Sequence, residues 1–175
     1  MKMQFGNKEI FSIETELDEN YGGAWLFGKI CYWIKGVQVG DYDLGTSLRD
    51  TFHSLKWIVY DCGNRAGEGL CKLSPEEIFF ILADVPYENN GSIINSNFQI
   101  PDTLPRFDIS IGVDVFDKWK IYLIECETEA KVIFKTIDQA EINIAVIPIG
   151  VFDSAVKNYY NYLDEIYEKE RITSV

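Results

Sequence analysis

Three closely spaced aspartates, Asp41, Asp43 and Asp50, are the first candidates for chemistry in this chain of 175 residues. Carboxylates so close in sequence could exchange protons with a substrate or bind a hard cation. The segment that holds them, GDYDLGTSLRD, lacks the D-x-[DN]-x-[DN]-G order of a calcium loop. Aspartate side chains also accept hydrogen bonds from backbone N–H groups in turns and at helix starts. We therefore favour turn and cap roles, with contact to a partner protein as the main alternative.

Nucleophilic catalysis would require His53, the one histidine of the chain, because Ser/His/Asp and Cys/His sets both use a histidine as the base. His53 falls on the side of its predicted helix that we assign to solvent. A thiol of Cys62 or Cys71 paired with His53 stays an alternative. We predict that the chain has no catalytic residues and is not an enzyme.

The cysteines and the glycine-rich segment Gly63–Gly69 carry no signature of a metal or cofactor site. The four cysteines are Cys31, Cys62, Cys71 and Cys126. They form no CxxC pair and three of them lie in or beside apolar runs, so we expect free thiols in the core. A single histidine does not allow a tetrahedral zinc site of usual spacing. The glycines contain neither Gly-Lys-Ser/Thr nor GxGxxG, so we predict no phosphate loop, no metal and no cofactor.

The segment Ala24–Asp50 supplies the elements that must position the three aspartates. Its first part, Ala24–Ile34, is an apolar and aromatic run that predicts a strand buried on both faces. A tight turn at Lys35-Gly36 lets Val37–Val39 return antiparallel. The aspartates then lie between this hairpin and the helix that follows it.

The remaining elements follow from hydrophobic periodicity and from helix-start signals. Ser47 and Asp50, three residues apart, resemble a capping box and predict a helix over residues 46–61. Ser74-Pro75, followed by two glutamates, predicts a second helix that ends near residue 83 or 85. The other predicted elements are strands at 9–17, 106–115, 118–126, 130–137 and 142–149, a long surface loop at 86–105 and a final helix at 152–171.

The order strands, helix, helix, strands, helix lacks the alternation of a parallel α/β fold. It predicts an α+β fold, a single domain over residues 1–175 with a mostly antiparallel β-sheet and about three helices packed on it. A chain of this length matches one domain and can bury a substantial core.

Acidic residues outnumber basic ones, 28 against 16, which gives a formal net charge of −12. Such a surface repels phosphate backbones and anionic membranes, so we predict no nucleic-acid and no membrane partner. A basic protein partner would be favoured. The N-terminal residues MKMQFGNKEIF lack the apolar core of a signal peptide, and no apolar run approaches 18 residues. We therefore expect a cytoplasmic protein.

The densest acidic feature lies on and after the predicted strand at residues 9–17. Alternation places Glu14 and Glu16 on the face opposite to the apolar side chains. Together with Asp18 and Glu19 they form an acidic stripe. Two interpretations remain open, a solvated sheet face and a docking surface for a basic partner.

Several segments between Phe5 and Glu125 resemble a family of bacterial immunity proteins, immunity protein family forty-two. They are Phe5-Gly6-Asn7-Lys8, Trp25-Leu26-Phe27-Gly28, Cys31-Tyr32-Trp33-Ile34, Gly45-Thr46-Ser47-Leu48-Arg49-Asp50, Arg106-Phe107-Asp108-Ile109-Ser110 and Val113-Asp114-Val115-Phe116-Asp117. The resemblance implies a small cytoplasmic antidote, made beside a polymorphic toxin such as the C-terminal toxin region of a contact-dependent growth inhibition system. It would bind that toxin tightly, block the active site and have no catalysis of its own.

The charge and the resemblance together predict a basic partner, a cognate toxin C-terminal domain with nuclease activity. Nucleases need positive surfaces to hold phosphates, and an acidic protein can occupy the same surface after fast association. The residues that we expect to contact the toxin are Glu14, Glu16, Asp18, Glu19, Asp41 and Asp43. The alternative is a regulatory or structural protein-binding module without a toxin partner. The sequence makes no prediction of the oligomeric state.

Overall fold

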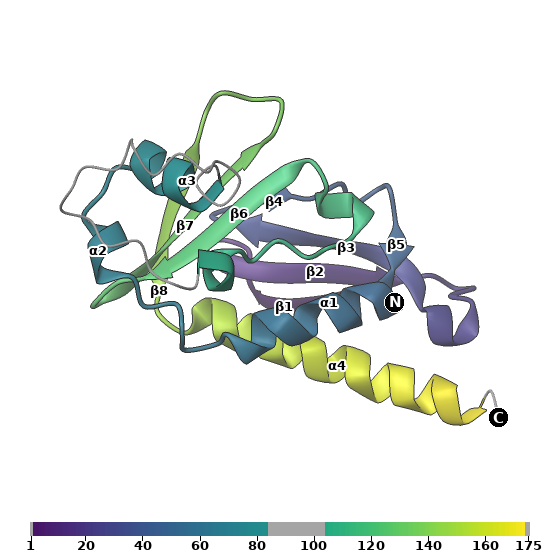
Figure 1. Ribbon diagram of the computed structural model, residues 1–175. Coiled ribbons are helices and arrows are strands. Elements are labelled where there is room, and N and C mark those ends of the chain that lie inside the picture. The colour runs from purple at the N-terminus through teal and green to yellow at the C-terminus, as the bar shows by residue number, and fades with distance from the viewer. Residues whose placement is uncertain (1, 84–103, 174–175) are drawn as a thin grey trace. The chain divides into compact units, whose positions relative to one another are not determined.

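The computed structural model describes residues 2–83 and 104–173 (Figure 1). These residues form two compact units. Unit 1 contains the described residues of 1–62, 111–118 and 150–175, and unit 2 contains those of 63–110 and 119–149. The prediction of one domain over residues 1–175 stays a prediction beside this division.

The sheet of unit 1 is antiparallel throughout. Its strands lie in the order β1-β2-β3-β4, and β5 pairs with the start of β3. The strands are β1 (Lys2–Asn7), β2 (Phe11–Leu17), β3 (Phe27–Ile34), β4 (Val37–Val39) and β5 (Thr46–Ser47). The predicted turn joins β3 to β4, because Lys35 and Gly36 both have positive φ, 50° and 79°, as a two-residue hairpin turn requires.

Two helices, α1 (Leu48–Tyr60) and α4 (Val151–Thr173), lie side by side against one face of this sheet (Figure 1). The cap residue of α1 is Ser47, whose hydroxyl accepts a hydrogen bond from the Asp50 N–H at 3.2 Å, as the sequence predicts. The core beneath the helices is aromatic. Phe11 of β2 meets Phe152 of α4 with ring centroids 5.0 Å apart.

Unit 2 combines a three-stranded antiparallel sheet with two helices. The strand order is β6-β7-β8, with β6 (Trp119–Glu125), β7 (Glu129–Thr136) and β8 (Asn143–Pro148). The helices are α2 (Glu68–Cys71) and α3 (Pro75–Ala83). Ser74 and Glu77 form a reciprocal capping box at the start of α3, at 2.9 and 3.2 Å. Apolar side chains of α3 pack on Tyr122 and Ile133 of the sheet.

The α+β class is confirmed, with antiparallel sheets and, in the described residues, three helices of seven or more residues. The strands form two sheets instead of a single one. The predicted strand at 106–115 is wrong. Two short 3-10 helices, η2 (Leu104–Phe107) and η3 (Asp114–Phe116), overlap its two ends. Between them the chain makes an isolated antiparallel bridge from Asp108 to Tyr122 of β6, and the side chains of Asp108 and Ser110 accept hydrogen bonds from the N–H groups of Ser110 and Ile121, which interrupts regular strand pairing. Most of the loop predicted at 86–105 lies outside the described residues.

The expectation of four free thiols is also wrong. Cys71 and Cys126 form a disulfide with an S–S distance of 2.10 Å, whereas Cys31 and Cys62 are free. The pair could not be read from the sequence because 55 residues separate its members. Short backbone pairing brings them together, since Glu125 donates to the Arg65 carbonyl oxygen at 2.8 Å directly before Cys126. None of the helices in the described residues has the length and apolar character needed to cross a membrane.

Candidate functional site: an acidic cleft in unit 1

Glu14, at the centre of β2, is 4% exposed, so the interpretation of a solvated sheet face does not hold at this residue. Lys2 and Lys8 both form ion pairs with its carboxylate, Lys2 at 2.6 Å. The same two ammonium groups lie over aromatic rings, Lys2 over Tyr42 and Lys8 over Trp33, at 5.1 and 4.1 Å from the ring centroids. Alternation identified the correct face of the strand, but side chains from neighbouring elements cover it. The role of Glu14 is therefore to hold the Lys2 and Lys8 side chains that cover it.

The ion pairs of Glu14 should make unit 1 sensitive to acid. Burial raises the pKa of Glu14, but hydrogen bonds from Lys2 and Lys8 outweigh it and hold the pKa below its ordinary value of 4.5. The pairing therefore stabilises the fold above pH 4.5 and is lost as the pH falls through the lowered pKa. We expect Glu14→Gln to cost about 1 kcal/mol at pH 7 and to flatten the loss of stability in acid. Urea unfolding at pH 7 and pH 3 would measure both, and equal pH profiles for the two proteins would contradict this role.

The other acids predicted to contact a partner remain accessible. Three are exposed: Asp18, Glu19 and Asp41. The Asp43 side chain is 93% exposed and lies 3.4 Å from the Lys29 ammonium. Glu16 is half-buried and accepts a hydrogen bond from the Tyr42 hydroxyl at 3.2 Å. Burial and this bond raise the pKa of Tyr42, so the phenol stays protonated and keeps donating to Glu16.

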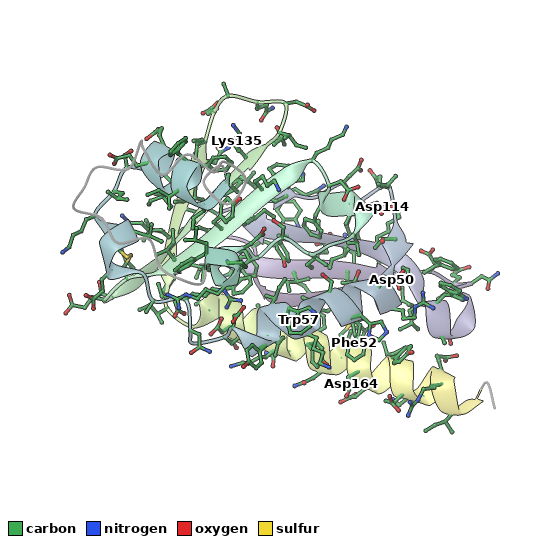
Figure 2. All side chains as sticks on the ribbon, in the orientation of Figure 1. Asp50, Phe52, Trp57, Asp114, Lys135 and Asp164 are labelled. Atoms are coloured by element: carbon green, nitrogen blue, oxygen red, sulfur yellow. A yellow bond between two sulfur atoms is a disulfide. The ribbon has the colours of Figure 1, made fainter. Side chains whose placement is uncertain are left out.

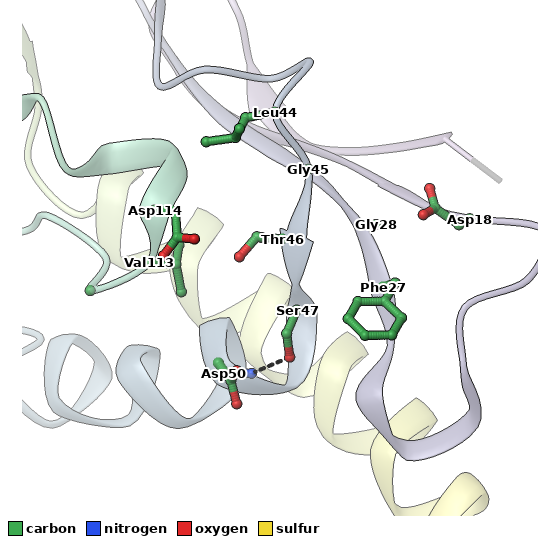
Figure 3. Close-up of a pocket in the computed structure, with 11 residues that line it drawn as sticks. Asp18, Phe27, Gly28, Leu44, Gly45, Thr46, Ser47, Asp50, Val113 and Asp114 are labelled. Atoms are coloured by element: carbon green, nitrogen blue, oxygen red, sulfur yellow. Dashed lines mark hydrogen bonds between the residues drawn. The ribbon is translucent and has the colours of Figure 1, made fainter.

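An open cleft of about 530 Å³ adjoins these acids in unit 1 (Figure 3). It combines carboxylates with apolar side chains and glycines. The carboxylates are Asp18, Asp50 and Asp114, the apolar side chains are Phe27, Leu44 and Val113, and the glycines are Gly28, Gly45 and Gly112. The lining contains no lysine or arginine. We call this feature the acidic cleft.

The floor of the acidic cleft depends on a close approach of β2 and α1 to Gly28 of β3. Thr46 of β5 pairs with Gly28 of β3. A Cβ atom at Gly28 would lie 2.3 Å from the Glu16 carbonyl oxygen and 2.9 Å from Leu48 Cδ1. Any larger residue would displace backbone, so glycine is required where these strands and α1 meet.

An exposed aromatic pair, Trp25 and Phe27, borders the cleft. Their rings are 50% and 44% exposed and stack with centroids 6.2 Å apart. The Arg49 guanidinium lies 3.7 Å from the Trp25 ring centroid, and its Nε and Nη2 both donate to Asp50 Oδ1, at 3.0 and 2.9 Å. The prediction of a strand buried on both faces from residue 24 is wrong here, since β3 begins at Phe27 and both rings face solvent.

The segment 111–116 forms another wall of the cleft and was not predicted to contribute. Hydrogen bonds anchor it at two points within unit 1. The Gly112 N–H donates to Ser54 Oγ of α1 at 2.9 Å, and the Asp41 N–H donates to the Val115 carbonyl oxygen at 2.8 Å. No local sequence pattern links this segment to Asp18, because only the fold brings them to one cleft.

The residues considered for catalysis take part in packing, in a disulfide or in backbone hydrogen bonds. The His53 ring lies against Phe52 and Tyr167, with centroids 5.3 and 5.6 Å away. Cys71 is held in the disulfide, so it is not a free thiol partner for His53. The other candidate thiol, Cys62, donates to the Ile58 carbonyl oxygen at 3.7 Å within α1 and its C-terminal end. Across residues 2–83 and 104–173, no three His, Cys, Asp or Glu side chains are grouped as a metal site would need.

The α+β architecture of this chain has a counterpart among solved structures. The chain is similar to the crystal structure of CdiI from Burkholderia dolosa AUO158, with a TM-score of 0.72 and 21% identity, covering 91% of this chain and 99% of that one. Residues 3–162 match the family described as Immunity protein 42, and the chain belongs to this family of immunity proteins. The resemblance seen in the sequence is thus confirmed. No curated protein matches the chain in sequence.

Proposed function

We propose that this chain binds and neutralises a cognate toxin domain, a basic nuclease of a contact-dependent growth inhibition system, in the cytoplasm. Membership of the immunity protein family over residues 3–162 carries this proposal. The chain acts by occluding the toxin's active site, without catalysis and without a cofactor. Its acidic surface suits a partner that must itself be positive to hold nucleic acid.

The proposed contact surface of unit 1 consists of the accessible acids and the acidic cleft. Its carboxylates are Glu16, Asp18, Glu19, Asp41 and Asp43. Glu14 contributes indirectly, because its ion pairs hold the side chains of Lys2 and Lys8 in place. The net charge of −12 adds a long-range field that attracts a basic protein before contact.

The proposal is tested by co-expression with the toxin region that we expect the gene immediately upstream to encode. Cells that produce the toxin region alone should stop growing, and cells that also produce this chain should grow. A second variant, Gly28→Val, keeps the net charge but should clash with the Glu16 carbonyl oxygen of β2 and with Leu48 of α1, and so reduce protection. Growth arrest despite normal levels of the wild-type chain would contradict the proposal.

Electrostatic attraction predicts a salt-dependent association rate. Raising the ionic strength from about 0.01 M to about 0.15 M shortens the Debye length from about 30 Å to about 8 Å. Association with the toxin region, measured by stopped-flow fluorescence, should slow several-fold over this range while dissociation changes little. A rate that is constant over the range would show that the acids do not steer the encounter.

A further inference from the structure

The acidic cleft holds two carboxylates that lack a cationic partner. Asp50 is paired with Arg49, but Asp18 and Asp114 form no ion pair with any described residue. Figure 3 shows these two side chains on opposite sides of β5, with Thr46 between them. Because the lining contains no lysine or arginine, the cleft has an uncompensated negative charge.

The same cleft exposes apolar side chains, and covering them on binding would be favourable. Leu44 is 58% exposed and Phe27 is 44% exposed. The Phe27 ring is already held in position, since it stacks on Trp25 and closely approaches Gly22, where a Cβ atom would lie 2.9 Å from the ring. A fixed aromatic ring beside open apolar surface is typical of a protein-binding anchor, because little side-chain entropy is lost on contact.

The combination favours one kind of occupant. A lysine or arginine side chain has an aliphatic stem that packs on apolar surface and a charged end that binds carboxylates. A bare metal ion would gain nothing from Phe27 and Leu44, and a phosphate backbone would be repelled by Asp18 and Asp114. The cleft volume of about 530 Å³ falls within the range of binding pockets, about 300–1,000 Å³.

Resting on the proposed function, we infer that the acidic cleft receives a lysine or arginine side chain of the toxin. Its stem lies along Phe27 and Leu44, and its charged end bonds to Asp18 or Asp114. This contact anchors the bound complex, whereas the exposed acids around it act mainly on the approach. Removal of this contact should therefore speed dissociation of the complex.

The test uses variants that keep the shape of the cleft and remove its charge or its apolar wall. They are the double variant Asp18→Asn with Asp114→Asn, and the single variant Leu44→Ala. Matched controls are Asp164→Asn on α4 and Trp57→Ala on α1, an exposed acid and an exposed aromatic away from Asp50 and Asp114 (Figure 2). Circular dichroism melts establish that each variant is folded.

Binding of the purified toxin region is measured by biolayer interferometry. The double variant should bind about 100-fold more weakly, mostly through a faster dissociation rate, and Leu44→Ala about 10-fold more weakly. The two controls should bind as the wild type does. In addition, hydrogen exchange should slow at residues 44–47 and 112–114 in the complex.

Three results would overturn the inference, and they separate it from the proposed function. Wild-type affinity in the double variant, with tight binding by the wild type, would reject the cleft while leaving the toxin partner intact. A larger loss from Trp57→Ala than from the cleft variants would place the anchor on α1. No binding by the wild type would reject both the inference and the proposed function.

Discussion

Association of the toxin region with the triple variant Glu19→Lys, Asp41→Lys and Asp43→Lys is expected to be about 100-fold slower than with the wild type at low salt. All three side chains are exposed in unit 1, so the reversal changes the field without removing a buried contact. One weak surface pair, Asp43 with Lys29, is lost and should cost little stability. Stopped-flow measurement would also show a flatter salt dependence, since fewer favourable charges remain to be screened.

A control for this prediction has the same net charge as this triple variant but carries the three lysines elsewhere. The triple variant Glu127→Lys, Asp138→Lys and Glu141→Lys makes the same change of charge on exposed residues of unit 2. If unit 1 carries the contact surface, this control should slow association much less. Equal rates for the two variants would mean that only the total charge matters and would remove the argument for a local surface.

Loss of the disulfide is expected to produce the largest change in stability. Cys71 and Cys126 are 55 residues apart, and closing a loop of that length stabilises a fold by about 4 kcal/mol. The double variant Cys71→Ala with Cys126→Ala should therefore lower the free energy of unfolding of unit 2 by about this amount. Trp119 is the one tryptophan of unit 2 and reports its unfolding by fluorescence once the three of unit 1 are replaced by phenylalanine.

The matched control is Cys62→Ala, a free half-buried cysteine whose thiol donates to the Ile58 carbonyl oxygen. It should leave the unfolding of unit 2 unchanged. The disulfide borders an open cleft of about 450 Å³, so a soluble dithiol can reach it. Adding such a reductant to the wild type should reproduce the double variant. Unchanged stability after verified reduction would contradict the prediction.

The disulfide also bears on the proposed cytoplasmic location, because a reducing cytosol keeps most protein thiols reduced. The acidic cleft and the exposed acids belong to unit 1, whereas both cysteines belong to unit 2. We therefore expect the reduced protein to bind the toxin region as the oxidised one does. A loss of binding on reduction, with unit 1 still folded, would place part of the contact surface in unit 2.

Elements with a local signal were predictable from the sequence. Ser47 and Ser74 mark the starts of α1 and α3, and the alternation at residues 9–17 identifies β2. The strand predicted at 106–115 failed because its apolar periodicity carries no information on the backbone bonds that Asp108 and Ser110 make. The division of the strands into two sheets, β1–β5 and β6–β8, could likewise not be predicted, since it depends on which strands meet in space.

The candidate site was predictable in part. Residue type and spacing identified Asp18, Asp41 and Asp43 as accessible acids, and the structure places them at the surface of unit 1. Glu14 was misplaced because two lysines from outside its strand cover it. Asp114 was missed entirely, because its position in the acidic cleft depends on hydrogen bonds of segment 111–116 with residues far away in the sequence.

We propose that this chain neutralises its toxin by binding it and blocking its activity. The most direct test titrates the purified chain into the purified toxin region and follows cleavage of RNA and of DNA. We predict that the cleavage rate falls in proportion to the added chain and reaches zero at one equivalent. Full cleavage at one equivalent, in a mixture in which the complex has formed, would contradict occlusion of the active site.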